Sequence, residues 1–239
     1  MKTVLFVATA ASAVAASADA GFLGFVASYR NVGAYTVVDV FAGVSNSSDK
    51  FLSVYDSAIS TAGGFYQQAG LATKAWKPDT AGFTSTRDSI DSFMTAGTYT
   101  GGAYGGVFYA STNSNGDPNF TGTTGAWNAT PGSAPATTIP ALAGWFTGDP
   151  PSVDNTAESL AGLAGRIDLS GGAAATHGIW VAHLVVSGND ASINWAAYGS
   201  VKDGVTSNIS SALSSGVIPA PGAIALLGAA GLASRRRRA

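Results

Sequence analysis

The sequence contains no cysteine, and only 11% of its 239 residues are charged, less than half the usual share. Without cysteine the chain has no disulfide, no thiol nucleophile and no thiolate metal site. Glutamate occurs once, at Glu158, and histidine twice, at His177 and His183. Hydrophobic residues make up 46% of the chain, which is enough for a core that holds itself without covalent cross-links.

Basic residues are scarce between the two ends of the chain. When Lys2, Asp19 and Arg235 to Arg238 are set aside, seven basic residues face 13 acidic ones, a formal balance of −6. No basic stripe remains to meet phosphates, so nucleic-acid binding is not expected. All of these acidic residues except Glu158 are aspartates, which favour turns and caps.

Residues 1–20 have the order of a secretory signal peptide. Lys2 supplies the positive first region, and an apolar run from Val4 to Ala16 follows it. Small residues then allow cleavage by signal peptidase after Ala18 or after Ala20, with Ala20 preferred. The alternative, a membrane anchor, needs a longer apolar run of about 20 residues.

Residues 217–239 have the features of a second sorting signal, at the other end of the chain. A short proline motif comes first, Pro219-Ala220-Pro221. Its two prolines end any preceding helix or strand and hold the chain extended. An apolar run over 222–233 is too short for a comfortable membrane span and predicts transient association with the membrane. The positive-inside rule keeps the closing basic run in the cytoplasm, namely Arg235, Arg236, Arg237 and Arg238. A permanent anchor is the alternative.

This order of features resembles the PEP-CTERM sorting signal of Gram-negative and planctomycete-like bacteria. The motifs that carry the resemblance are Pro219-x-Pro221, Leu226-Leu227-Gly228, Gly231-Leu232 and Arg235 to Arg238, with Ala220 in place of the family's central Glu. The resemblance implies processing by an exosortase-type membrane peptidase and delivery to the cell surface, outer envelope or extracellular polysaccharide matrix. The segments 91–97 and 180–186 are also similar to uncharacterised planctomycete-type surface proteins.

Residues 21–216 are expected to form one domain. Short strand-like runs between Gly, Asn, Asp and Ser clusters predict an all-β sandwich or jelly roll. Two hairpins are predicted, one from 35–44 with 51–55 and the other from 180–186 with 193–201. One short helix is predicted over 154–164, and the proline-rich stretch 111–152 predicts a long irregular loop.

Two strand patterns say which side chains face the core. In the run 193–201, Trp195 and Val201 face one way and Tyr198 the other. In the run 35–44, Asp39 shares a face with Phe41. An unpaired buried carboxylate is costly, so the Asp39 face is predicted to lie partly at the surface.

Catalytic signals are weak throughout. No G-x-S-x-G, S-x-x-K, H-E-x-x-H or P-loop motif occurs. His177 and His183 would lie about 20 Å apart along a strand, too far for one metal ion or a proton relay. The loop 113–119 offers oxygen ligands to Ca²⁺ without the EF-hand order, and no other cofactor is expected.

Three tryptophans near predicted loops are candidates to stack on a ligand: Trp76, Trp127 and Trp145. Packing in the core is the alternative for each of them. The leading hypothesis is therefore a non-enzymatic, exported surface or matrix protein that is structural or binds polysaccharide. The alternative is a secreted hydrolase acting on polysaccharide, which needs two carboxylates converging in a cleft.

Overall fold

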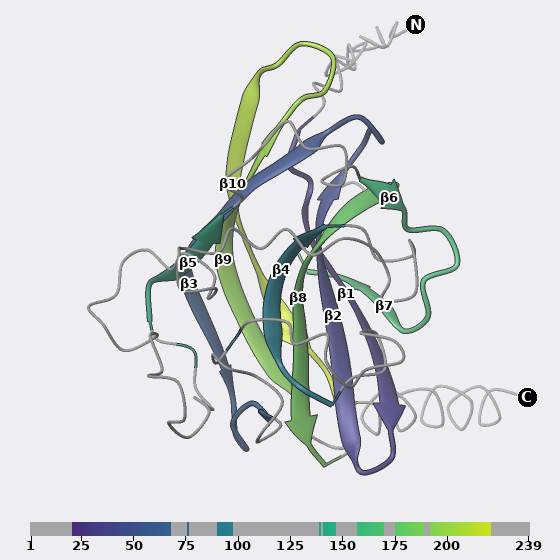
Figure 1. Ribbon diagram of the computed structural model, residues 1–239, viewed down its shortest axis with the longest axis vertical. Helices are drawn as coiled ribbons and strands as arrows, with labels where there is room; N and C mark the ends of the chain where they lie inside the picture. The colour runs from purple at the N-terminus through teal and green to yellow at the C-terminus, as the bar shows by residue number, and fades with distance from the viewer. Residues whose placement is uncertain are drawn as a thin grey trace, which may run out of the picture.

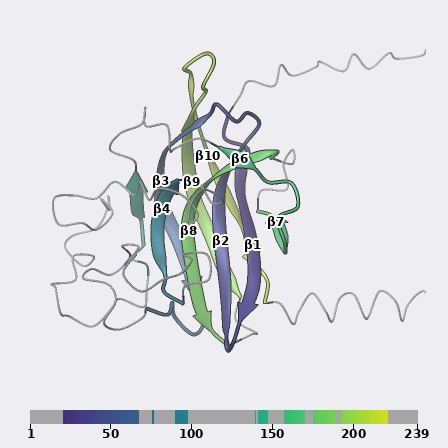
Figure 2. The same cartoon turned by 45° about the vertical axis from the view of Figure 1, so that its right-hand side comes forward.

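The computed structural model describes residues 21–67, 76, 90–97, 139, 141–146, 157–169, 175–188 and 192–220. These residues form ten strands and no helix, and the strands build two facing antiparallel sheets (Figures 1 and 2). The all-β sandwich predicted from the sequence is therefore confirmed.

Sheet A has the strand order β4-β8-β2-β1-β7, and β6 pairs with β8 beside this row (Figure 1). Long central strands are flanked by short ones in this sheet, as expected where a sheet ends. Its strands are β1 (Gly24–Val32), β2 (Tyr35–Val44), β4 (Phe93–Gly97), β6 (Glu158–Ser159), β7 (Arg166–Asp168) and β8 (His177–Ser187).

Sheet B has the strand order β10-β9-β3-β5. Its strands are β3 (Lys50–Thr61), β5 (Ala143–Phe146), β9 (Ile193–Lys202) and β10 (Ile209–Ile218). The register of β3 against β9 shifts twice, between Phe51 and Ser53 and between Tyr55 and Ala58. Asp56 lies in the second shift with a φ of 48°, the left-handed conformation that a bulge residue often takes.

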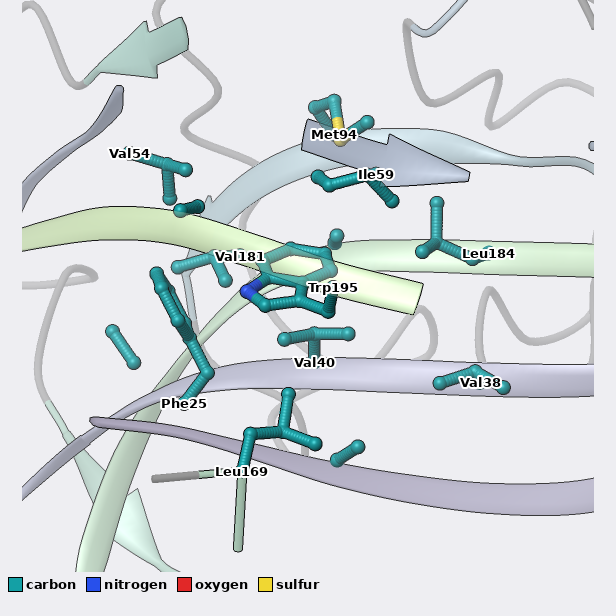
Figure 3. Packing of buried hydrophobic residues seen from close by; sticks show 14 of the residues in the cluster. Phe25, Val38, Val40, Val54, Ile59, Met94, Leu169, Val181, Leu184 and Trp195 are labelled. Carbon is teal, nitrogen blue, oxygen red and sulfur yellow. The ribbon is translucent and has the colours of Figure 1, made fainter. Parts of the chain in front are cut away.

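The core fills the space between the sheets. Figure 3 shows Trp195 of sheet B among Val40 and Val181 of sheet A, with Phe25 beside it. The ring centroids of Phe25 and Trp195 are 5.0 Å apart with an edge-to-face angle of 66°. Trp195 and Val201 are buried and Tyr198 is half-buried, so the alternation predicted for this strand is confirmed.

The sandwich closes on one side where β10 packs on β1. Two serines of β10 turn inward and accept hydrogen bonds from the β1 side: Ser210 Oγ from the Phe22 N–H (2.6 Å) and Ser214 Oγ from the Phe25 N–H (3.0 Å). Buried backbone N–H groups need such partners. The serines of β10 thereby join the two sheets.

Both predicted hairpins are wrong in their pairing. Strands β2 and β3 lie in different sheets, and so do β8 and β9, so each connection crosses the sandwich. The strands themselves were found because each has an apolar face, but that face does not specify which strand supplies the hydrogen bonds. The hairpins that do form are β9–β10 and β1–β2, where Gly33 takes a φ of +60° in a two-residue turn.

The predicted helix over 154–164 is also wrong for its described part. Glu158 and Ser159 pair with β8 as a short strand, and turns follow. The Leu160 N–H donates to the Thr176 carbonyl (2.9 Å), and the Leu160 side chain is buried. Backbone hydrogen bonds to β8 and to Thr176 just before it thus take the place of those of a helix. Residues 154–156 lie outside the described residues.

Candidate functional site

Two of the three candidate tryptophans belong to the core, and the structure corrects the prediction for them. Trp76 is 0% and Trp145 is 1% exposed. The indole Nε1 of Trp145 donates to the Val181 carbonyl (3.0 Å), and Trp76 packs edge-on against Phe65. Neither ring offers a face to a ligand, and Trp127 lies outside the described residues.

The predicted sorting motif begins where the last strand ends. Ile218, the final residue of β10, is 1% exposed, and Ala220 is 7% exposed after Pro219. The motif therefore starts at the core with no spacer. The other predicted address residues lie outside the described residues: Ala18, Ala20, Pro221, Arg235, Arg236, Arg237 and Arg238. The candidate Ca²⁺ loop 113–119 also lies outside them.

A buried ion network crosses sheet A at Asp39, which the sequence was wrongly expected to leave partly at the surface. Asp39 of β2 lies opposite His183 of β8, and both are 0% exposed. His183 Nδ1 is 2.6 Å from Asp39 Oδ1. Since an ionised carboxylate only accepts, Nδ1 carries the proton. Arg30 of β1 donates to the second oxygen, Asp39 Oδ2.

The partners of Asp39 determine its ionisation. Burial raises the pKa of this carboxyl, but the charges and hydrogen bonds of His183 and Arg30 together outweigh burial and hold it below 3.8. Asp39 is therefore ionised at neutral pH. A buried, fully paired carboxylate of lowered pKa is a poor general base.

Aromatic rings cover the imidazole of His183. Phe93 of β4 stacks on it with ring centroids 4.7 Å apart and an angle of 16°, and Trp180 meets it edge-on at 5.8 Å. A pocket of about 290 Å³ lies beside Arg30, and Glu158 is the single carboxylate that lines it among the described residues. The buried network of Asp39, His183 and Arg30 supports a structural role, because its charges are paired within the network.

The outer face of sheet B is different, because it is open. Tyr55 of β3 and Tyr198 of β9 lie opposite each other in register and are half-buried. Their rings stack at 5.1 Å with an angle of 16°. The Tyr55 hydroxyl is 2.7 Å from Ser211 Oγ of β10, so Tyr55 reaches across β9. Ring stacking and the contact with Ser211 hold the pair in place.

Small, hydroxyl-bearing and apolar side chains surround the tyrosine pair. Leu213 lies opposite Tyr198, and Leu213 and Val217 are 54% and 55% exposed. Alternation along β9 and β10 places on this face the residues Asn194, Ala196, Ser200, Ser211 and Ser215. The sequence predicted that Tyr198 faces away from the core, but it gave no sign that Tyr55 would be its neighbour.

Comparisons add no relative: no protein-family model, curated protein or solved structure matches the chain. Among the described residues, no three His, Asp or Glu side chains gather as metal ligands would. The same part of the chain holds no helix that is long and apolar enough to cross a membrane.

Proposed function

We propose that this protein is exported to the cell surface or extracellular matrix and binds polysaccharide there without catalysing a reaction. The stacked pair of Tyr55 and Tyr198 on the open face of sheet B is the observation that carries the binding part. Signal peptidase and an exosortase-type peptidase are the proposed processing partners, as the resemblance of residues 217–239 implies.

The chemistry of the sheet B face suits a sugar chain. Aromatic rings pack against the apolar C–H faces of sugar rings, while their hydroxyls remain hydrogen-bonded at the edge. Serine hydroxyls such as that of Ser211 act as both donor and acceptor, as the hydroxyls of a sugar do. Strands β9 and β10 pair along ten residues each, about 33 Å, which gives a long surface for an extended chain.

Hydrolysis is supported less well than binding. Glycoside hydrolysis needs two carboxyl groups on either side of one bond, about 5 to 9.5 Å apart. Among the described residues, Glu158 is the single carboxylate lining the pocket on sheet A, and Asp203 the single one lining a second pocket on sheet B. We therefore base the proposal on binding.

Affinity electrophoresis in gels that contain a soluble polysaccharide tests the proposal. The purified protein is expected to be retarded. A Tyr55→Ala/Tyr198→Ala variant is expected to bind about 5-fold to 100-fold more weakly, since each of its two aromatic contacts contributes about 0.5–1.5 kcal/mol. The matched control is Tyr35→Ala/Tyr66→Ala, because these half-buried tyrosines also form a ring pair (4.7 Å) but on sheet A. It is expected to bind normally.

Two outcomes would oppose the proposal. Equal loss of binding in the Tyr55/Tyr198 variant and the Tyr35/Tyr66 control would mean that the sheet B face is not the binding surface. No retardation by neutral or acidic polysaccharides would remove the carbohydrate part and leave a structural surface protein.

A further inference from the structure

Strand β10 forms one edge of sheet B, and among the described residues no strand pairs with its outer side. Natural edge strands are usually short, bulged or charged, or contain proline, and these features keep other chains from pairing with them. Strand β10 is ten residues long, contains no charged residue and no proline, and pairs with β9 residue for residue. It is therefore an open template for a further strand.

The backbone of β10 directs hydrogen-bonding groups to this open side. At the turn between β9 and β10, the Asp203 N–H donates to the Asn208 carbonyl (2.8 Å), and these two residues continue the register of the strands as a hydrogen-bonded pair. Such pairs alternate with non-bonded ones along an antiparallel ladder. The alternation turns the N–H and C=O groups of the odd-numbered residues of β10 away from β9. These residues are Ile209, Ser211, Leu213, Ser215 and Val217.

The same odd-numbered residues carry exposed apolar side chains. Ile209, Leu213 and Val217 are 67%, 54% and 55% exposed and lie four residues apart on the outer face of the sheet. They are three of the five large hydrophobic side chains that are exposed in the described part of the chain. The hydrogen bonds of β10 to the β1 side use Ser210 and Ser214 instead, which face inward. A row of exposed apolar side chains along an open strand edge indicates an interaction surface.

The sequence of β10 is nearly the same when read in either direction from Leu213. Two identical antiparallel strands related by a two-fold axis place each residue opposite the one that lies equally far beyond the axis. With the axis at Leu213, Ile209 lies opposite Val217 of a second copy. Ser211 likewise lies opposite Ser215, and Leu213 lies opposite Leu213. Apolar side chains thus meet apolar ones, and hydroxyls meet hydroxyls.

Charge and backbone both agree with this pairing. Because β10 carries no charge, two copies of the strand meet without electrostatic repulsion. The odd-numbered residues lie opposite one another in this register, so their outward N–H and C=O groups can form about ten hydrogen bonds between the copies. A shift by two residues in either direction would place Leu213 opposite a serine. Pro219 follows β10 directly and ends the ladder, because it has no N–H.

We propose that two copies of this protein associate through their β10 edges, antiparallel and about a two-fold axis at Leu213. The four strands of sheet B in each copy then continue into one sheet across the two molecules. Because the axis is perpendicular to the sheet, the pairs of Tyr55 and Tyr198 in both copies lie on the same side. Self-association is independent of polysaccharide binding, so either can fail without the other.

Disulfide cross-linking tests the register, because the sequence has no cysteine of its own. A single introduced cysteine can therefore bond only to its copy in another molecule. At position 213 the two Cα atoms would lie about 5.5 Å apart, within the range of about 4.4–6.8 Å for a disulfide, whereas at position 217 they would lie about 26 Å apart. Under mild oxidation, Leu213→Cys is expected to become mainly a disulfide-linked dimer on a non-reducing gel. The control Val217→Cys, at a position of nearly equal exposure, is expected to stay mainly monomeric.

Analytical ultracentrifugation tests the association itself. The purified protein is expected to sediment with twice the mass of the monomer. Leu213→Lys is expected to halve that mass, because the axis would place two lysines directly opposite each other. The matched control is Leu142→Lys, which changes a leucine of similar exposure (58%) next to β5, at the opposite edge of sheet B, and is expected to remain dimeric. Thermal unfolding checks that both variants fold, as expected for substitutions of exposed side chains.

Three results would overturn the pairing of β10 edges. The first is an unmodified protein that stays monomeric at about 100 μM, or a dimer that Leu213→Lys leaves intact. The second is equal cross-linking of Leu213→Cys and Val217→Cys, which would mean that another part of the chain makes the contact. The third is dissociation by Leu142→Lys as well, which would show that added charge is the cause and the position on β10 is not.

Discussion

His183 Nδ1 and Asp39 Oδ1 lie 2.6 Å apart between neighbouring strands of sheet A, and neither residue has any exposed surface. The register makes this contact, because the two residues are direct partners across β2 and β8. Arg30 approaches the second oxygen from β1. The Asp39 carboxylate therefore links three neighbouring strands of sheet A, namely β8, β2 and β1.

Asp39→Asn is expected to lower the free energy of unfolding by about 3 kcal/mol, because it removes the buried carboxylate that pairs with Arg30 and accepts the hydrogen bond of His183. Urea unfolding followed by tryptophan fluorescence measures this. The control is Asp56→Asn, at an exposed bulge whose φ of 48° asparagine tolerates well, with an expected change within about 0.5 kcal/mol. Equal losses of stability in Asp39→Asn and Asp56→Asn would contradict the stabilising role of the Asp39 network.

The pH dependence of Asp39 has a definite sign. Its folded-state pKa lies below 3.8, because His183 and Arg30 outweigh the opposing effect of burial. Its contribution is therefore complete above pH 3.8 and is lost as the pH falls below that value. The stability difference between the unmodified protein and Asp39→Asn should narrow in this acidic range. A difference that stays constant down to about pH 2.5 would contradict the pairing.

The pH dependence of stability that Asp49 contributes should have the opposite sign. Burial raises its pKa, the nearby Asp203 adds to the rise, and both together outweigh the hydrogen bonds from Gly204 and Asn46. The folded protein thus holds the Asp49 proton more tightly than the unfolded chain, so this group's contribution falls as pH rises above 3.8. The stability of Asp49→Asn relative to the unmodified protein should increase with pH over that window and then level off. A decrease in this relative stability with rising pH would contradict a raised pKa for Asp49.

The sequence predicts the sheet architecture better than it predicts contacts between distant residues. Alternation in 193–201 predicts that Trp195 is buried and Tyr198 is outward, because each face of a strand is set by local periodicity. The same periodicity cannot say that Tyr198 faces Tyr55, or that Asp39 meets His183 across 144 positions of the chain. Pairing between strands is decided by the whole sandwich, and both candidate sites depend on it.

Strand β10 was missed for a related reason. Its sequence ISSALSSGVI contains four serines and resembles a polar loop. In the structure, Ser210 and Ser214 turn inward and accept hydrogen bonds from backbone N–H groups. A hydroxyl with such a partner is buried at little cost, so polarity alone did not reveal the strand.

Gly204→Ala is expected to destabilise the protein by about 1–3 kcal/mol, because its Cβ would lie 2.1 Å from the Ser48 carbonyl oxygen and push apart the turns that hold these two residues. The control is Gly63→Ala, where a Cβ meets nothing within 4 Å and stability should be unchanged or slightly higher. Thermal unfolding measures both.

The two ends of the chain are tested by intact-mass analysis of the protein from its native envelope and medium. Loss of residues 1–18 or 1–20 is expected from the signal peptide. A C-terminal cut is expected after Ile218, because Ile218 is buried, pairs with Ile193 and completes the last strand of the core. A mature C-terminus before Ile218 would remove part of that core and contradict this position for the cut. A C-terminus that still ends in Arg238-Ala239 would mean that the tail remains as an anchor, and the proposal of processing by an exosortase-type peptidase would then be withdrawn.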